Sequence, residues 1–326
     1  MSVEIKLSTL EPVRQTYTQI AKRFGDKPAS RYQEATYDIQ ATTNFHYKPT
    51  WDQDHNLNDP SRTAIVMNDW YLLKDPRQLY YATYVNSRAK MQDNAENNYA
   101  FFDKHNLASA LPEALKNKLI QYVLPLRHVE HTANLNNMYA VSLGSGTALT
   151  QALIYEGMDR LGIAQYISRI GLILDGNTGT SLVTAKEVWM DNSEWQALRS
   201  LCEELLVQKD WFEVLIAQDL VLDTLIADIY YRQMDNLFQE SQAPQGLMLF
   251  EFMKDWQKDR NRWLDSILKA VVKESDHNQQ TLNAWVEKWN IKACEALAPV
   301  TDLLLGGEAL ADAQATLANK LKKLGL

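Results

Sequence analysis

The feature that most constrains the fold is a nearly unbroken helical pattern from Pro76 to the end of the chain. The 326 residues include only 12 glycines and 9 prolines. Where these residues gather, they separate long runs in which apolar positions recur with the period of a helix. Few segments show the alternation of apolar and polar residues that is typical of a β-strand. The pattern predicts an all-α protein whose helices are long enough to form the core of a bundle.

Proline and glycine also indicate where the helices end. Pro76 stands at the favoured first position of a helix, with Asp75 as its expected cap. The clearest separator further along is the polar segment 241–246, which contains one proline and one glycine. After the helix that opens at Pro76, helices are expected over residues 111–141, 148–174, 182–208, 211–239, 247–273, 281–298 and 307–324.

The first 75 residues differ from the rest of the chain. Residues 27–60 show no sustained helical or strand period, so their aromatic rings cannot be buried against one another. We therefore expect an extended N-terminal arm over residues 1–75 and a helical domain over residues 76–326. The arm would lie either on the helical body or on a partner chain. Because aromatic and arginine side chains often anchor interfaces, the candidate partner contacts are Tyr32, Tyr37, Phe45, Tyr47, Trp51 and Arg62.

Charge and hydropathy exclude several classes of protein. With 41 acidic and 33 basic side chains, the chain has a formal charge of −8 and no basic stripe for a nucleic acid. No uncharged apolar stretch is long enough to span a membrane, and residues 1–10 lack the apolar core of a secretory signal. Two isolated cysteines, Cys202 and Cys294, form no disulfide framework. A cytoplasmic protein without nucleic-acid or membrane partners is expected.

Metal binding in a helical bundle would require the string Glu-x-x-His, because a spacing of three residues places both ligands on one helix face. The six histidines of the chain yield this string once, at Glu274 and His277. It falls in a polar stretch at a predicted helix end, where metal binding is not expected. A two-metal site would need two such strings and two further glutamates. The helical domain is therefore predicted to lack metal ligands.

Three strings resemble a known family. They are Pro-Leu-Arg-His-Val-Glu-His-Thr-Ala-Asn-Leu-Asn-Asn at 125–137, Asp-Pro-Ser-Arg-Thr at 59–63 and Asp-Pro-Arg-Gln-Leu-Tyr-Tyr at 75–81. They resemble the β subunits of the hydroxylase components of bacterial multicomponent monooxygenases. That group includes soluble methane monooxygenase, toluene/o-xylene monooxygenases and the phenol hydroxylases, which the strings resemble most. The likeness extends over residues 30–300.

The resemblance implies a ferritin-like fold, related to that of the catalytic α subunit and its carboxylate-bridged di-iron centre. It also implies that this chain is a non-catalytic structural subunit that braces α and holds no cofactor itself. The hydroxylase would assemble from two αβγ units, with a small γ subunit in each. A regulatory protein and a reductase carrying FAD and an iron–sulfur cluster would complete an NADH-dependent aromatic monooxygenase that acts on phenol or a related hydrocarbon.

The family's ligand pattern can be laid on this chain. The α subunits place a glutamate on one helix and Asp-Glu-x-Arg-His on the next, and then repeat the pair. Glu130 matches the first glutamate, and Asp223 is the candidate for its counterpart in the second half. The remaining four positions hold Arg160 and Arg260 in place of the glutamates, and Ile163 and Trp263 in place of the histidines.

These replacements imply a vacated metal site. Arginine is a permanent cation without an acceptor atom. Isoleucine has no lone pair, and tryptophan offers only an N–H donor. A buried carboxylate needs a partner, and an arginine can cross-link two helices. The pattern therefore predicts pairing of Glu130 with Arg160 and of Asp223 with Arg260.

Two other interpretations remain open. The chain could be an independent ferritin-like metalloprotein whose ligands lie elsewhere, although the count of Glu-x-x-His strings argues against it. It could also be a helical scaffold unrelated to oxygenases, and only the three family-like strings argue against that. The pattern does not identify the hydrocarbon substrate, because regioselectivity would be determined by a pocket in the partner.

Overall fold

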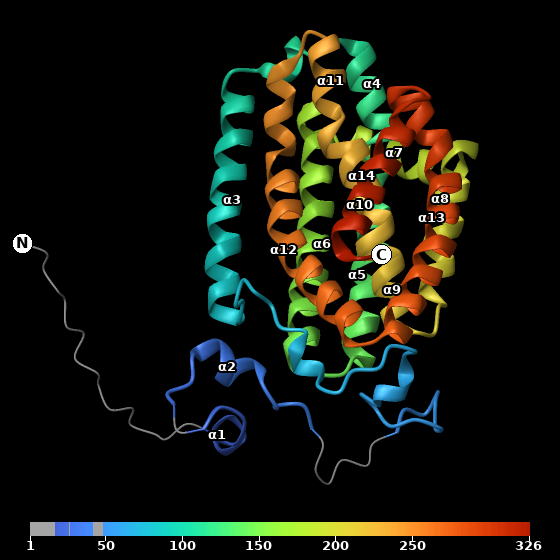
Figure 1. The fold of residues 1–326 in the computed structure, drawn as a ribbon. Helices are drawn as coiled ribbons and strands as arrows, with labels where there is room; N and C mark the ends of the chain where they lie inside the picture. Colours follow the sequence, from blue (N-terminus) through green and yellow to red (C-terminus); the bar gives the residue numbers. More distant parts are fainter. Residues whose placement is uncertain (1–16, 26, 42–47) are drawn as a thin grey trace, which may run out of the picture.

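The structure is a computed structural model that describes residues 17–25, 27–41 and 48–326. Over these residues every regular element is a helix, as the sequence predicts, and none is long and apolar enough to cross a membrane. Figure 1 shows the long helices standing side by side in a bundle. They are α3 (Tyr81–Lys104), α5 (Leu126–Leu143), α6 (Thr147–Leu174), α12 (Glu251–Glu274), α13 (Asp276–Leu305) and α14 (Ala309–Leu324).

Shorter helices complete the bundle. They include α4 (Glu113–Tyr122), α7 (Thr180–Asp191) and α8 (Ser193–Leu206). Short 3₁₀ turns are η1 (Pro60–Arg62), η2 (Trp70–Leu72), η3 (Leu107–Ala110) and η6 (Pro244–Phe250). The remaining helical stretch, residues 211–240, is called the central segment below. It consists of α9 (Trp211–Leu215), η4 (Ile216–Leu222), α10 (Asp223–Ala227), η5 (Asp228–Arg232) and α11 (Met234–Glu240).

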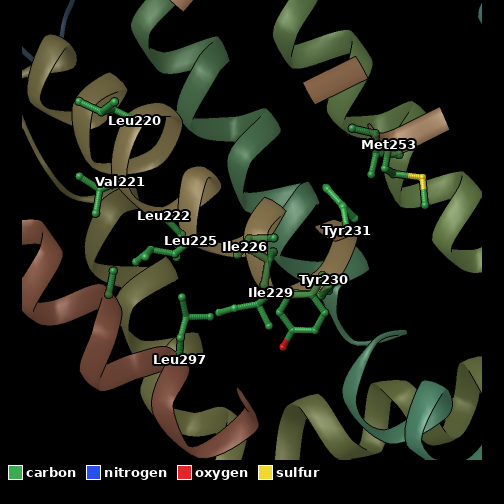
Figure 2. Packing of buried hydrophobic residues seen from close by; sticks show 14 of the residues in the cluster. Leu220, Val221, Leu222, Leu225, Ile226, Ile229, Tyr230, Tyr231, Met253 and Leu297 are labelled. Atoms are coloured by element: carbon green, nitrogen blue, oxygen red, sulfur yellow. The ribbon is translucent and has the colours of Figure 1, made fainter. Parts of the chain in front are cut away.

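The central segment forms the middle of the core. From Trp211 to Tyr231 every residue except Ala227 is buried, which marks a helix enclosed on all sides. Figure 2 shows its side chains pointing in several directions, with Leu297 of α13 on one side and Met253 of α12 on another. One continuous apolar cluster joins these residues to α5, α6 and α8.

Two π-helical turns, η4 and η5, interrupt the central segment. A π turn adds a residue to one helical turn and therefore changes which side chains face a given neighbour, often at a functional position. The sequence predicted one helix over residues 211–239, so its extent is nearly correct. The change in register was not predicted, and it affects Gln218, Asp219 and Asp223.

The start of α3 differs from the prediction. The helix begins at Tyr81 rather than Pro76, and Asp75 does not cap it. The reason is Gln78, whose φ of 54° is left-handed and cannot continue a right-handed helix. Asp75 instead accepts hydrogen bonds from the backbone N–H of Arg77 (2.8 Å) and from the Arg77 side chain.

Two other predicted helices are divided in the structure. The helix expected over residues 111–141 is α4 followed by α5, separated just before Pro125, which has no backbone N–H to donate. The helix expected over residues 182–208 is α7 followed by α8, because Asn192 adopts an extended conformation with ψ of 134°. Both breaks redirect the chain and let the shorter helices pack around the bundle.

Part of the N-terminal segment packs on one end of the bundle. It contains two short helices, α1 (Thr18–Phe24) and α2 (Arg31–Thr36), which lie below the bundle in Figure 1. The Thr36 hydroxyl donates to the side-chain oxygen of Gln151 on α6 at 2.9 Å. The side chain of Gln40 donates to the carbonyl of Gly144 at 2.9 Å, and its oxygen accepts the backbone N–H of Gly146. These contacts fasten the segment to the turn between α5 and α6.

Candidate functional site

Six charged side chains meet at the centre of the bundle, and none is more than 4% exposed. They come from α5, α6, the central segment and α12. Burying an ion costs several kcal/mol unless partners compensate its charge, so the arrangement of these six determines whether they are tolerated. The group, called the arginine–carboxylate cluster below, consists of Glu130, Glu156, Arg160, Asp219, Asp223 and Arg260.

Arg160 of α6 contacts three carboxylates. Its Nη1 donates to Glu130 Oε2 on α5 at 3.2 Å, which confirms the predicted pairing. Its Nη2 donates to Asp219 Oδ1 at 3.1 Å and also contacts Asp223 Oδ2. One guanidinium therefore links α5 and α6 to the central segment.

Arg260 of α12 contacts the same two aspartates of the central segment. Its Nη2 donates to the backbone carbonyl of Asp219 at 2.6 Å and to Asp219 Oδ1 at 2.8 Å. The predicted pair with Asp223 is also present, at 2.9 Å from Nη2 to Oδ2. The Arg260 Nε lies 3.3 Å from Glu156 Oε2 on α6. Asp219 and Asp223 are therefore shared by both arginines.

Glu156 and Asp219 were not among the predicted site residues. A signal for both exists in the sequence, because each lies four residues before a predicted member of the cluster, Arg160 and Asp223 respectively. A spacing of four places two side chains on the same face of a helix. The pattern used for the prediction contains only the positions of metal ligands, so it did not include them.

Trp256 of α12 lies against both arginines. The Arg160 guanidinium carbon is 4.7 Å from the centre of the indole ring, and that of Arg260 is 5.5 Å away. A cation over an aromatic face is stabilised by the ring quadrupole. The indole N–H donates to Asp159 Oδ2 at 3.0 Å, which fixes the ring's orientation.

A second layer of ion pairs surrounds the cluster. Arg88 of α3 pairs with Asp159 at 2.8 Å and with Asp259 at 3.1 Å. These two aspartates immediately precede Arg160 and Arg260 in the sequence. Arg77 lies 3.5 Å from Glu156 and 3.3 Å from Asp259. The outer ion pairs thus connect α3 and the segment before it to α6 and α12.

Comparison with known proteins identifies the family. The family model described as Methane/Phenol/Alkene Hydroxylase matches residues 51–275. The chain belongs to this hydroxylase family. It is 48% identical over 326 residues to the phenol 2-monooxygenase oxygenase component DmpL of Pseudomonas sp. (strain CF600), covering 100% of this chain and 98% of that protein.

A more distant relative and two solved structures extend the comparison. The chain is 21% identical over 243 residues to the hydroxylase beta subunit of the toluene-4-monooxygenase system of Ectopseudomonas mendocina, covering 73% of each. A solved structure of phenol hydroxylase from Pseudomonas sp. OX1 matches with a TM-score of 0.94 and 48% identity, covering 99% of this chain and 98% of that chain. A toluene 4-monooxygenase structure matches at a TM-score of 0.78 and 18% identity, covering 91% of this chain and 99% of that chain. The predicted ferritin-like fold and the family resemblance are confirmed.

The two positions that align with histidines of the hydroxylase pattern lie in the core. Ile163 and Trp263 are each 0% exposed. Trp263 lies near Arg77, whose guanidinium carbon is 5.8 Å from the ring centre. Neither side chain has a lone pair that could bind a metal. His128, two residues before Glu130, instead stacks on Trp189 with the ring centres 5.6 Å apart, and burial lowers its pKa to about 4.

The residues of the cluster do not fit a pair of metal ions. In the described part of the chain, no three His, Cys, Asp or Glu side chains are arranged to hold one. The carboxylates that could donate are occupied by guanidinium groups, as the distances above show. An added cation would meet two fixed positive charges a few ångströms away, and in a buried site that repulsion is only weakly screened. The chemistry that the donor set supports is ion pairing between helices.

Burial changes the protonation of two cluster members. It raises the pKa of Glu130 to about 7, against the opposing effect of Arg160. It raises the pKa of Glu156 to about 7 in the same way, opposed by Arg77 and Arg260. Four carboxylates outnumber two arginines in the cluster, so partial protonation of the two glutamates near neutral pH brings its net charge closer to zero.

The candidate interface residues of the arm have different surroundings. Tyr32 is 6% and Tyr37 7% exposed, because they pack with Ile20 and, for Tyr37, with Tyr71, whose ring is stacked 5.4 Å away. The backbone N–H of Asp75 donates to the Tyr32 hydroxyl at 2.9 Å. The two rings also meet edge to face, with centres 6.3 Å apart, so the expectation that the rings of this segment cannot be buried against one another is wrong for this pair. Their other neighbours are too distant in sequence for local periodicity to reveal.

The other candidate partner contacts of the arm differ from one another in exposure. The Arg62 side chain, 6% exposed, pairs with Asp52 at 2.5 Å and donates to the carbonyls of Asn56 at 2.9 Å and His55 at 3.2 Å. It therefore fastens its own loop rather than presenting its charge to a partner. Trp51 is 76% exposed. Phe45 and Tyr47 lie outside the described residues.

Proposed function

We propose that this chain is a non-catalytic structural subunit of a phenol-hydroxylating oxygenase component and that it braces the catalytic subunit. The observation that carries the proposal is the pair of buried arginines, Arg160 and Arg260, which occupy the positions of metal-binding glutamates in the family pattern. Family membership and 48% identity to a phenol 2-monooxygenase oxygenase component support the complex and its substrate class.

The arginine–carboxylate cluster supplies the rigidity that such a brace needs. Arg160 joins α5, α6 and the central segment, while Arg260 joins the central segment to α6 and α12. An ion pair buried in this way has a defined geometry, and breaking it leaves an uncompensated charge. The four helices are therefore held in one register, in much the way a shared metal ion would hold them.

The remaining components follow from the same proposal. A catalytic α subunit would hold the di-iron centre, and a small γ subunit would complete each half of an (αβγ)2 hydroxylase. A regulatory protein and an NADH-dependent reductase with FAD and an iron–sulfur cluster would supply control and electrons. In support, the relatives are named as oxygenase components or, in toluene-4-monooxygenase, as a hydroxylase subunit beta.

Iron analysis and reconstitution test the proposal together. The chain is purified alone and after co-expression with the catalytic subunit of a phenol hydroxylase, and both samples are assayed for iron and for phenol hydroxylation with reductase and regulatory protein added. The chain alone should hold no stoichiometric iron and hydroxylate nothing. It should also co-purify with the catalytic subunit in an iron-containing, active complex. Stoichiometric iron in the chain alone, or failure to co-purify, would contradict the proposal.

A further inference from the structure

The outer side of α5 and α6 is apolar over a considerable length. Leu135 of α5 is 40% exposed, and on α6 Ile154 is 37% exposed, Met158 44% and Leu161 44%. The two helices are close neighbours: the Asn134 side chain donates to the carbonyl of Gly157 at 2.6 Å. The surface called the α5/α6 face below is defined by Arg127, His131, Leu135, Ile154, Met158 and Leu161.

The middle of this face has no charged side chain. From Thr147 to Ser168 the charged residues of α6 are Glu156, Asp159 and Arg160, and all three are buried on the inner side. The exposed side of α12 shows the contrasting pattern of a helix in water, with Glu251, Asp255, Lys258, Arg262 and Lys269. A contiguous uncharged apolar surface beside polar ones is typical of a protein interface.

One end of the face is a basic groove. A cavity of about 600 Å³ lies there between α5 and α6, and no Asp or Glu lines it. Its basic side chains are Arg127, His131 and Arg169, whereas His128, whose pKa burial lowers to about 4, lines it as a neutral ring. Arg169 pairs with Glu96 at 3.0 Å. For Arg127, no ion pair with any described residue occurs, and burial lowers its pKa. A basic groove in a chain with a net charge of −8 is complementary to a carboxylate from another protein.

We propose that the α5/α6 face is the docking surface for the catalytic subunit of the oxygenase component. The catalytic subunit packs an apolar helix over Leu135, Met158 and Leu161 and places a carboxylate beside Arg127 and His131. This inference rests on the proposed function and identifies the surface through which the brace acts.

A second copy of this chain fits the face less well. In a two-fold symmetric contact the same surface meets itself. The α5/α6 face would then place its basic groove against residues of an identical face, which exposes no carboxylate of its own. The charge complementarity therefore favours a different chain over self-association.

Acidic substitutions on the face test the assignment directly. Met158→Glu and Leu161→Glu each place a charge in the middle of the proposed contact, and Arg127→Glu reverses the charge of the groove. Each variant is co-expressed with a tagged catalytic subunit, and the amount recovered on the tag is quantified. Recovery should fall at least tenfold for Met158→Glu and Leu161→Glu and also fall for Arg127→Glu, while Arg127→Lys should retain most of it.

The matched control is Ile291→Glu on α13. Ile291 is 55% exposed, more than either tested residue, and lies among charged neighbours such as Lys288 and Glu295. This variant should be recovered like the unchanged chain. Melting temperatures of all variants establish that they fold. Independently of any substitution, backbone amides of α5 and α6 in the unchanged chain should exchange hydrogen more slowly in the complex than in the chain alone.

The outcomes separate this inference from the proposed function. If the unchanged chain is not recovered with the catalytic subunit, the proposed function fails and this inference fails with it. If Met158→Glu and Leu161→Glu are recovered as well as the unchanged chain, the docking surface is wrong while the proposed function stands. If the isolated chain dimerises and Met158→Glu abolishes only that dimer, the occupant is a second copy and the inference is overturned.

Discussion

Arg160 and Arg260 carry permanent positive charges and are buried. Neither side chain is more than 2% exposed. Removing such ions from water costs several kcal/mol each. The cost is offset because the carboxylates of Asp219 and Asp223 contact both guanidinium groups, while Glu130 and Glu156 each contact one of them. Replacing one arginine therefore removes hydrogen bonds and also leaves buried carboxylates without a counter-charge.

Arg160→Met is expected to destabilise the chain strongly. Methionine fills a similar volume but leaves Glu130, Asp219 and Asp223 with less compensation, at a cost of about 3–5 kcal/mol in the free energy of unfolding. Urea unfolding followed by circular dichroism measures the difference. The matched control is Arg262→Met on α12, whose side chain is 64% exposed and lies 3.8 Å from its carboxylate partner. That change should cost less than about 0.5 kcal/mol, and equal costs for the two would contradict the role of the cluster.

The two raised glutamate pKa values predict a pH dependence of stability. In the unfolded chain a glutamic acid titrates near pH 4.3, whereas Glu130 and Glu156 titrate at about 7 in the folded chain. The folded state therefore binds more protons between these values. Their contribution to stability is complete below the unfolded pKa and declines as the pH rises through the folded pKa.

Glu130→Gln should remove part of that decline. Glutamine keeps the shape and stays neutral, so the variant should gain stability relative to the unchanged chain as the pH rises from 5 to 7, on the order of 1 kcal/mol per pH unit. Urea unfolding across this pH range measures the difference. Glu203→Gln, at a side chain that is 63% exposed, is the surface control, and its stability is compared with that of the unchanged chain over the same pH range. A pH-independent difference for Glu130→Gln would show that this carboxyl is ionised throughout.

The sequence predicts the helices better than the segments that join them. The 28-residue helix α6 was predicted within one residue of its ends, because glycine-containing turns stand at both ends of a long apolar run. The start of α3 was missed, because a left-handed residue other than glycine, Gln78, has no distinct signature. The π turns η4 and η5 were missed because the apolar pattern of residues 211–239 does not distinguish a π turn from an α-helical one.

We propose that the arm of residues 1–75 binds a partner, and the structure indicates which of its residues should be changed to test this role. Deleting residues 1–60 would also remove Tyr32 and Tyr37, which are buried within the chain. Trp51→Ala is sharper, because the ring is 76% exposed. It should weaken binding to the catalytic subunit about tenfold or more, as loss of an aromatic anchor does. Binding is measured by titration with the labelled catalytic subunit.

A control of equal exposure is available for the arm. Val207→Ala removes an apolar side chain that is also 76% exposed, on the turn after α8. It should leave the affinity unchanged. If Trp51→Ala binds as tightly as Val207→Ala, the arm does not anchor a partner through Trp51. The proposal that the arm binds a partner would then lack an exposed aromatic side chain to support it.

Two similar strings, Asp159-Arg160 and Asp259-Arg260, lie one hundred residues apart in the sequence and converge on one cluster in the folded molecule. The family pattern predicted both pairings because it fixes which helix positions face one another. It could not predict that Arg88 would bridge both aspartates, since that depends on how α3 packs. Long-range pairs outside the pattern, such as those of Glu156 with Arg77 and Arg260, needed the folded structure.

The role of the cluster as a brace can be tested in the assembled enzyme. If the cluster only braces the bundle, weakening it should reduce the stability of this chain without affecting iron that is held elsewhere. Glu130→Ala removes one carboxylate beside Arg160 and should lower the free energy of unfolding by about 1–3 kcal/mol. The purified complex should nevertheless contain the same iron per catalytic subunit as the unchanged complex, and the same hydroxylation rate per iron. Elemental analysis and activity are measured well below the melting temperature, with Glu130→Gln as the milder variant. If the Glu130→Ala complex contained less iron per catalytic subunit, Glu130 would contribute to a metal site. The buried positions of Arg160 and Arg260 would then need a different explanation.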